Sequence, residues 1–392
     1  MESTHSHSNA LLIIAGETSG DTHGAALVRN LISGRPGLTI AGIGGRKMEL
    51  AGMKLLYRVS DMSFMGFAEV IKHLPFIRKV MNRLESWVEQ HQPDAVILID
   101  YPGFNLRFAR RMKKRNIPVY YYISPQVWAW GKGRLKKMKR LVDKMFVIFP
   151  FEKSLYTQHD VPVEFVGHPL VEEIAEVIPR DEFYHHQGFD PDIPTIGLLP
   201  GSRHQEIERH FSAMVHAAEI IRSQMDQVQF WVAVAPDLNR EDFPGSDEVP
   251  ALRFVEGQTY EIMQHSDAVM VSSGSATLEI AYFGTPMVIL YKMSRLTWWL
   301  GNLLVDMPYI GLANIVAEKK IVPELLQDQA NPGNIAREIL RYFTEPEHAN
   351  SVRENLADVR SKLGTPGAGK RVAQSIISTI YGDLDTEPVR DE

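Results

Sequence analysis

The run of small and hydroxyl-bearing residues from Ser272 to Glu279 is the most informative segment of this chain, because its residue types could bind a ligand. It follows an apolar, strand-like segment at 268–271 and leads into a helix-like segment that ends before Gly284. Small residues let the backbone approach a ligand closely, and the free N–H groups at a helix start favour a phosphate. Glu279 lies one turn inside that helix, within reach of a diol such as a ribose. A capped helix start without any ligand gives the same pattern, so the run alone leaves both interpretations open.

Two further junctions have the same order of strand, small-residue turn and helix. One passes from the apolar strand 195–199 through Pro200-Gly201-Ser202-Arg203 into a helix at 210–222, and its arginine has the fork geometry that suits a diphosphate. The other contains the residues from Ala15 to Asp21. Three such junctions predict open α/β sheets that bind ligands at the carboxyl ends of their strands. None has the glycine pattern of a P-loop or a dinucleotide fingerprint.

Eight motifs, taken in order, resemble the lipid-A-disaccharide synthase family. They are Ala15-Gly16-Glu17-Thr18-Ser19-Gly20-Asp21, Phe64-Met65-Gly66-Phe67-Ala68-Glu69-Val70, Ile99-Asp100-Tyr101-Pro102-Gly103-Phe104-Asn105, Ser124-Pro125-Gln126-Val127-Trp128-Ala129-Trp130, Pro150-Phe151-Glu152, Gly167-His168-Pro169, Leu199-Pro200-Gly201-Ser202-Arg203 and Ser273-Gly274-Ser275-Ala276-Thr277-Leu278-Glu279. The resemblance runs from about residue 11 to about residue 380. It implies an inverting glycosyltransferase of the B-type fold, acting in lipid A biosynthesis. Such an enzyme joins UDP-2,3-diacylglucosamine to 2,3-diacylglucosamine 1-phosphate, giving a tetraacyl disaccharide 1-phosphate and UDP.

Asp100 is the residue that we expect to act as the general base. It follows the apolar strand 95–99, at the carboxyl edge of the sheet, where partial desolvation raises the pKa of a carboxyl group toward the working pH. Capping of the following helix at 106–114 is the alternative role for this side chain. The match of Ile-Asp-x-Pro-x-Phe-Asn as a unit favours catalysis.

The resemblance also implies which residues bind the two sugars and the nucleotide. We expect the nucleotide to contact Ser202, Arg203, Ser273, Gly274, Ser275, Ala276, Thr277 and Glu279. We expect sugar hydroxyls to contact Gly16, Glu17, Ser19, Asp21, Asn314, Glu324 and Gln327. The chain has no Asp-x-Asp metal motif at these positions, so we expect neither a metal nor a cofactor, and positive charge for the leaving diphosphate would come from Arg203 and helix N-termini. A structural ion pair between Arg203 and Glu279 is the competing interpretation.

The elements that must position these residues form two similar series along the chain. Apolar strand-like segments lie at 11–15, 38–43, 95–99, 119–123, 145–149 and 163–166, and again at 195–199, 229–233, 252–255, 268–271 and 287–291. Segments with helical spacing separate them. With 392 residues, 44% of them hydrophobic, the chain is long enough for two domains. The prediction is an α/β protein with two doubly wound, Rossmann-like domains that face a cleft.

The expected domain limits follow the breaks in this pattern. Residues 1–9 are expected to be disordered, 10–168 to form an acceptor- and lipid-binding domain, 169–364 to form a UDP-sugar-binding domain, 365–381 to form a terminal helix, and 382–392 to be a disordered tail. The terminal helix is expected to pack across the domains or onto a partner chain. A homodimer is one arrangement that the sequence allows.

Charge and apolar clusters indicate the kind of surface that the chain meets. Residues 1–168 hold 24 Lys and Arg against 14 Asp and Glu, whereas the remainder is acidic, so the N-terminal half favours an anionic partner. Nucleic acid ranks last, because no nucleic-acid module accompanies the basic clusters. Phe64, Phe67, Trp298 and Trp299 are candidates for membrane contact. With no cysteine, no apolar run of transmembrane length and no visible secretory signal, we expect a cytoplasmic protein, peripheral on the inner face of the cytoplasmic membrane.

Two other functions fit parts of the same pattern. A UDP-N-acetylglucosamine 2-epimerase shares the two-domain architecture and the nucleotide loop, but it needs no acceptor and no site for acyl chains. A nucleotide-sugar or lipid-binding protein without catalysis would tolerate the loss of Asp100. Assays with and without an acceptor distinguish these alternatives from a glycosyltransferase.

Overall fold

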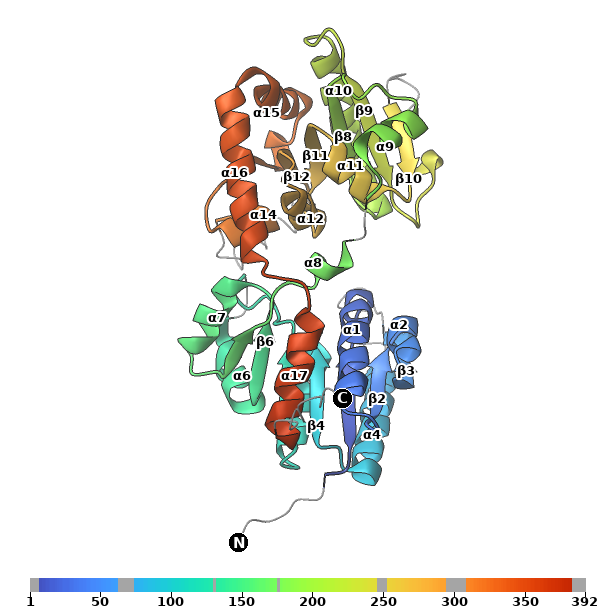
Figure 1. Cartoon of the computed structure of the whole chain (residues 1–392), viewed down its shortest axis with the longest axis vertical. Coiled ribbons are helices and arrows are strands. Elements are labelled where there is room, and N and C mark those ends of the chain that lie inside the picture. The colour runs from blue at the N-terminus through green and yellow to red at the C-terminus, as the bar shows by residue number, and fades with distance from the viewer. Residues whose placement is uncertain are drawn as a thin grey trace, which may run out of the picture. The chain divides into compact units, whose positions relative to one another are not determined.

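The computed structural model describes residues 7–62, 74–129, 132–174, 177–244, 252–293 and 308–382 (Figure 1). The chain divides into two compact units. The first comprises residues 1–169 together with 365–392, and the second comprises residues 170–364. Each unit is built around its own parallel sheet with helices between the strands.

The first unit contains a seven-stranded sheet in the order β3-β2-β1-β4-β5-β6-β7. Its strands are β1 (Ala10–Ala15), β2 (Thr39–Gly44), β3 (Lys54–Arg58), β4 (Ala95–Ile99), β5 (Val119–Tyr122), β6 (Lys144–Val147) and β7 (Val163–Phe165). Its helices are α1 (Thr18–Gly34), α2 (Arg46–Leu50), α4 (Leu74–His91), α5 (Pro102–Lys113), α6 (Leu135–Leu141), α7 (Pro150–Thr157) and α17 (Ala368–Tyr381), with short 3₁₀ turns η1 (Val59–Met62) and η2 (Lys132–Arg134). The strand order reverses between β1 and β4, so the loops after these two strands lie at the point where such sheets bind ligands.

The second unit contains a six-stranded sheet in the order β10-β9-β8-β11-β12-β13. Its strands are β8 (Thr195–Leu199), β9 (Gln229–Val234), β10 (Leu252–Glu256), β11 (Ala268–Ser272), β12 (Met287–Tyr291) and β13 (Glu324–Leu326). Its helices are α8 (Leu170–Glu173), α9 (Arg180–Gln187), α10 (His204–Arg222), α11 (Thr259–His265), α12 (Ala276–Phe283), α14 (Leu312–Ala317), α15 (Pro332–Thr344) and α16 (Pro346–Lys362), with turns η3 (Arg240–Asp242) and η4 (Gln327–Gln329). Here the order reverses between β8 and β11.

The central strands are apolar along their whole length because helices cover both faces of a parallel sheet. Every residue of β1, β4, β8 and β11 is buried. This explains why continuous apolar runs, rather than alternating ones, marked the strands in the sequence. The prediction of two doubly wound α/β sheets is confirmed.

Two edge strands, β3 and β13, were missed in the sequence. In β3 the sequence Lys-Leu-Leu-Tyr-Arg is only half-buried, with charged residues at both ends, and β13 has three residues. Edge strands bury less surface and therefore carry a weaker apolar signal. The helix predicted at 210–222 begins earlier, at His204, because its first turn is mostly polar.

The last helix, α17, belongs to the first unit (Figure 1, red). It packs against α1, and Gly369 lies so close to Ala26 and Leu27 that a side chain there would crowd the α1 backbone. Arg371 donates from Nε to the carbonyl oxygen of Val166 at 2.8 Å, at the end of β7. The chain therefore returns from the second unit to complete the helical layer of the first.

Candidate active site

The loop between β11 and α12 has the conformation of a small-residue turn at a helix start. Ser273 extends the sheet by donating its N–H to the carbonyl oxygen of Leu290 at 2.9 Å. Thr277 is fully buried; its hydroxyl donates to the carbonyl oxygen of Gly274 at 2.8 Å and accepts the N–H of Leu312 at 3.2 Å. Thr277 therefore holds the loop in shape from behind, whereas Gly274 and Ser275 are exposed. In the first turn of α12 the N–H groups of residues 277, 278 and 279 donate to the carbonyl oxygens of Gly274 and Ser275, at 3.3, 2.9 and 3.2 Å. The feature of this helix start that suits an anion is therefore the positive end of its dipole.

The corresponding loop after β8 differs from expectation in one respect. Gly201 has a φ of 131°, a conformation that favours glycine. Glu206, in the first turn of α10, accepts the N–H of Ser202 at 2.9 Å, so a carboxylate of the chain itself already uses this donor. The N–H of Ser202 is therefore used within the chain, and phosphate binding at the helix start after it stays a prediction. The exposed Arg203 side chain remains the cationic group of the loop.

These two loops line one cavity of about 570 Å³ within the second unit. Its wall includes the predicted nucleotide-binding residues Ser202, Arg203, Ser273, Gly274, Ser275, Ala276 and Glu279. Thr277, the eighth of them, supports the loop and is not part of the wall. A cavity of this size is in the usual range for a nucleotide or a cofactor.

Glu279 and Tyr260 give this cavity its electrostatic character. Burial raises the pKa of the Glu279 carboxyl, a hydrogen bond from Ser275 lowers it, and the nearby Glu173 raises it. Burial, with Glu279 and Glu173 close by, raises the pKa of Tyr260 to about 12. A half-buried carboxylate of this kind is suited to accept hydrogen bonds from neutral hydroxyls. Among the described contacts, Glu279 forms no ion pair with Arg203.

In the first unit, Asp100 directly follows β4 and lies in the left-handed region, with a φ of 44°. Its N–H donates to the carbonyl oxygen of Tyr122 at 3.1 Å, and its own carbonyl oxygen accepts Nδ2 of Asn105 at 2.7 Å and the hydroxyl of Tyr121. The surrounding strands therefore fix a backbone conformation that is uncommon outside glycine. Tyr101, not Asp100, is the N-cap residue of α5, so capping does not explain the aspartate.

The environment of Asp100 resembles that of a general base. The pKa of its carboxyl is raised to about 6, by burial first and by the nearby Glu17 carboxylate second, against the lowering effects of the Tyr101 N–H and the charge of His23. A base whose pKa lies close to the working pH combines a usable ionised fraction with proton affinity. Perturbed carboxyl groups of this kind are concentrated at functional sites.

The loop after β1 lies beside Asp100. A side chain at Gly16 would collide with the ring of Tyr101, so glycine permits the close approach of the two loops. Glu17 is the N-cap residue of α1, and Glu17 and Ser19 are both exposed at its start. The structure therefore brings Gly16, Glu17 and Asp100 together at the reversal point of the first sheet.

Three other predicted sugar-binding residues, Asp21, Asn314 and Glu324, form hydrogen bonds within the chain. Both carboxylate oxygens of the buried Asp21 accept backbone N–H groups at the start of α2: Gly45 at 2.7 Å, Met48 at 3.0 Å and Lys47 at 3.1 Å. Glu324 accepts the N–H groups of residues 310 and 311, each at 2.9 Å, and Nδ2 of the fully buried Asn314 at 2.8 Å. Asp21 and Glu324 each accept three hydrogen bonds from the chain itself, which hold the local structure, and contact with a sugar hydroxyl stays a prediction for these residues.

Gln327 is the seventh residue assigned to sugar binding. It follows β13 at the carboxyl edge of the second sheet, with a φ of 51°. Its side-chain nitrogen is buried, and no hydrogen-bond partner is present among the described residues. Gln327 therefore remains a candidate for ligand contact, because none of the described contacts accounts for its buried side-chain nitrogen.

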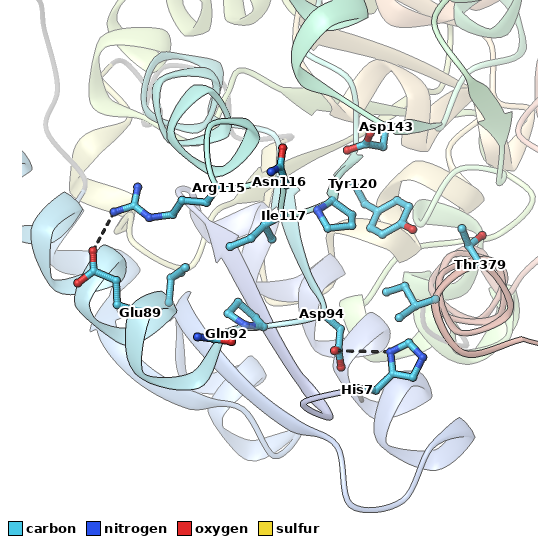
Figure 2. Close-up of a pocket in the computed structure, with 14 residues that line it drawn as sticks. His7, Glu89, Gln92, Asp94, Arg115, Asn116, Ile117, Tyr120, Asp143 and Thr379 are labelled. Carbon is cyan, nitrogen blue, oxygen red and sulfur yellow. Dashed lines mark hydrogen bonds and ion pairs between the residues drawn. The ribbon is translucent and has the colours of Figure 1, made fainter. Parts of the chain in front are cut away.

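A second, larger cavity of about 920 Å³ lies at the opposite edge of the first sheet (Figure 2). It is lined by residues that precede β4 and β5, such as Asp94 and Pro118. Its charged groups are engaged: Asp94 lies 3.6 Å from His7, and Arg115 lies 2.9 Å from Glu89 (Figure 2). None of the site residues predicted from the sequence lines this cavity, and the cavity does not lie at the carboxyl edge of the sheet.

Phe64, Phe67, Trp298 and Trp299 lie outside the described residues. Within the described ranges, no helix is both long enough and apolar enough to span a bilayer. Part of the basic cluster at 107–115 forms ion pairs inside the unit, since Lys113 contacts Asp143 at 2.7 Å and Arg111 contacts Glu85.

Comparison with known proteins shows which family the chain matches. The family model for lipid-A-disaccharide synthetase matches residues 11–374 of the chain. The chain is 45% identical to the lipid-A-disaccharide synthase of Syntrophus aciditrophicus (strain SB), over 95% of this chain and 98% of that protein. It is 42% identical to the synthase of Geobacter sulfurreducens (strain ATCC 51573 / DSM 12127 / PCA), over 96% of this chain and 99% of that protein.

Solved structures with the same fold have little sequence in common with the chain. UDP-GlcNAc 2-epimerase from Neisseria meningitidis, bound to UDP-GlcNAc, aligns with a TM-score of 0.62 at 14% identity, covering 94% of this chain and 100% of that one. The glycotransferase of kitacinnamycin aligns with a TM-score of 0.64 at 12% identity, covering 95% and 98%. At these identities the likeness shows the two-domain α/β fold alone.

Proposed function

The chain belongs to the lipid-A-disaccharide synthetase family and is a glycosyltransferase that forms the lipid A disaccharide, and we propose that Asp100 is its general base. The observation that carries this proposal is the position of Asp100 at the reversal point of the first sheet, in a fixed left-handed conformation, with a pKa raised to about 6. The donor is UDP-2,3-diacylglucosamine and the acceptor is 2,3-diacylglucosamine 1-phosphate.

The proposed reaction is a single displacement with inversion. Asp100 accepts the proton of the acceptor hydroxyl as its oxygen attacks the anomeric carbon of the donor sugar. The new glycosidic C–O bond forms while the bond from that carbon to the β-phosphate oxygen breaks, and UDP leaves with the electron pair. Negative charge thus moves from the base onto the diphosphate, where positioned dipoles and cations stabilise it.

The 570 Å³ cavity of the second unit is the proposed site of the nucleotide. Arg203 and the first turn of α12 supply positive charge to the diphosphate. Glu279, half-buried in the cavity wall, accepts hydrogen bonds from the ribose hydroxyls. Glu17, beside Asp100, orients a sugar hydroxyl and keeps the pKa of the base high.

The substrates imply where the enzyme works. Both carry acyl chains, so we place the protein on the inner face of the cytoplasmic membrane, as a peripheral protein of the cytoplasm. Sedimentation with vesicles of anionic phospholipid tests this placement. Protein that stays in the supernatant at low salt would contradict it, because electrostatic attraction is then least screened.

A discontinuous assay tests the activity. The protein is incubated with the two acylated substrates, and UDP and a tetraacyl disaccharide 1-phosphate are measured. Omission of the acceptor is the control, since release of UDP or epimerised sugar without an acceptor would favour an epimerase. Formation of UDP only in the presence of both substrates is the expected result.

A further inference from the structure

Three of the sequence motifs have no role in the reaction as described so far. They are the loop 124–129 after β5, the turn into α7 that ends at Glu152, and the residues around His168 after β7. The strands β5, β6 and β7 lie in this order beside β4 in the first sheet. All three motifs are therefore at the same carboxyl edge as Asp100.

Glu152 joins two of these motifs through one buried carboxylate, which is 1% exposed. Its Oε2 accepts the N–H groups of Phe149 at 3.1 Å and Ile148 at 3.3 Å, in the turn between β6 and α7. Its Oε1 accepts Nε1–H of Trp128 at 3.2 Å, in the loop after β5. Capping α7 would need only the first pair of bonds, so the bond to the indole is an additional constraint.

Aromatic rings continue this connection along the sheet edge. The rings of Trp128 and Phe151 meet edge to face, with centroids 5.5 Å apart. Phe151 stacks on Phe149 at 5.5 Å, and Phe149 contacts the imidazole of His168 at 5.1 Å. Trp128 itself is only partly buried, so part of its indole remains available at the surface of the unit.

The strand β5 connects this cluster to the proposed base. The carbonyl oxygen of Tyr122 accepts the N–H of Asp100 at 3.1 Å, and the hydroxyl of Tyr121 donates to the Asp100 carbonyl oxygen. The loop with Trp128 begins at Ser124, two residues later, and the Ser124 hydroxyl is hydrogen-bonded to the hydroxyl of Tyr156 at 2.7 Å. The backbone of the base is thus hydrogen-bonded to the end of β5, the strand from which the loop with Trp128 continues.

We propose that Glu152 is a positioning residue for the acceptor: it fixes the indole of Trp128 so that the ring forms one wall of the acceptor site beside Asp100. This inference rests on the proposed function, in which the acceptor hydroxyl binds at Asp100. One face of a pyranose ring presents C–H groups, which pack on the flat apolar surface of an indole. Glu152 does not touch the substrate and acts through Trp128.

The experiment measures the KM of the acceptor and the Kd of UDP in three variants. Trp128→Ala removes the ring, and Glu152→Gln leaves a side chain of the same shape that can no longer accept hydrogen bonds on both sides. Both should raise the acceptor KM roughly tenfold, with kcat within about threefold and UDP affinity unchanged, as expected when only acceptor binding is weakened. Trp128→Phe keeps a ring without the N–H, and its acceptor KM should lie between those of the parent and Trp128→Ala.

Asp94→Asn is the matched control. Asp94 also accepts a backbone N–H and an aromatic donor, from Ser8 and from the Tyr381 hydroxyl, each at 2.8 Å, but it precedes β4 at the opposite edge of the sheet. This variant should lose thermal stability, as Glu152→Gln does, and keep the parental acceptor KM. A parental acceptor KM in folded Glu152→Gln and Trp128→Ala would overturn the inference, as would an equal increase in Asp94→Asn.

The outcomes also separate this inference from the proposed function. A parent protein that releases no UDP from the two substrates refutes the proposed function and the inference with it. An active parent whose Asp100→Asn variant is inactive, but whose Trp128→Ala variant has an unchanged acceptor KM, refutes the inference alone. If Glu152→Gln does not fold, the two Trp128 variants decide.

Discussion

In the first sheet the strand order reverses between β1 and β4, and in the second it reverses between β8 and β11. The loops that follow these four strands are equivalent in position, yet they carry different side chains. The first pair presents the carboxylates Glu17 and Asp100, whereas the second presents Arg203 and the small residues of 273–276. On the proposed assignment, one fold supplies a proton acceptor in one unit and an anion site in the other, and the loops alone make the difference.

Burial acts on a carboxyl group at both reversal points. It raises the pKa of Asp100 and that of Glu279. In the first unit another carboxylate, Glu17, strengthens the effect, so the group there is suited to take up a proton. In the second unit a hydrogen bond from Ser275 opposes the effect of burial on Glu279, while the nearby Glu173 adds to it. The hydrogen bond favours the ionised form of Glu279, which accepts hydrogen bonds.

The strongest test of this comparison is Asp100→Asn. Asparagine keeps the shape of the side chain and tolerates the left-handed backbone, but it cannot accept the proton. Turnover should fall by roughly 10²–10⁴, the usual contribution of a positioned base, while the UDP affinity stays the same. Single-turnover kinetics and calorimetric titration of UDP measure the two quantities. A near-parental rate in the folded variant would refute the catalytic role and direct attention to Glu17.

In the second unit the corresponding test is loss of nucleotide affinity. Arg203→Ala and Glu279→Ala should each weaken UDP binding by about 1–3 kcal/mol, because each leaves a polar group of the ligand without its partner. Arg222→Ala is the matched control, since Arg222 is an exposed arginine at the far end of the same helix, α10. Calorimetry that finds parental affinity in both cavity variants would move the nucleotide elsewhere.

The substitution Asp100→Asn should raise the stability of the fold although it lowers the activity. The folded pKa of Asp100, about 6, exceeds the ordinary value of 3.8, so the fold disfavours the ionised form. Ionisation of Asp100 therefore lowers the free energy of unfolding. This loss of stability is absent below about pH 4 and reaches its full size above about pH 6, and Asp100→Asn should remove it. Because the side chain is partly exposed, we expect a gain of about 1–2 kcal/mol at pH 8 and none at pH 3.5. Urea unfolding of the parent and the variant at the two pH values measures this gain. An equal change in unfolding free energy at both pH values would contradict the prediction.

The smallest expected effect concerns the interaction of the two carboxylates. If Asp100 is the base, its pKa predicts an acid limb of the parental kcat/KM profile near pH 6. Glu17 raises that pKa, so Glu17→Gln should move the limb to lower pH by less than about one unit. The profile of a Glu279→Gln variant should keep the parental limb position. A limb that does not move in Glu17→Gln would show that the two carboxylates do not interact during turnover.

The sequence was sufficient for the features that depend on local pattern. The buried strands of both sheets, the small-residue loops and the residue that follows β4 all have a signal within a few positions, and the structure confirms the α/β architecture. The Ser273–Glu279 loop and the Gly201–Arg203 turn, 70 positions apart, line the same cavity because parallel strands bring their carboxyl ends to one edge.

Partners from distant parts of the chain could not be inferred in this way. Asp21 and Asn314 have the residue types of sugar ligands, but backbone groups more than twenty positions away in one case, and seven or eight in the other, use their polar atoms. Glu152 is the opposite case. The sequence indicated its motif, but the hydrogen bond that it accepts from Trp128, 24 positions earlier, is evident only in the structure. Sequence spacing does not tell whether a polar atom faces a ligand or a peptide group.

The return of α17 to the first unit has a consequence for how the protein is made. The surface of α1 that α17 covers is synthesised more than 300 residues before its partner helix, because α1 ends at Gly34 and α17 begins at Ala368. During translation the first unit must therefore wait, with apolar groups of α1 uncovered, until the second unit has left the ribosome. Such late, long-range closure slows folding and exposes the chain to aggregation and chaperone binding. A nascent chain that stops after α16 would be released with its first unit unfinished.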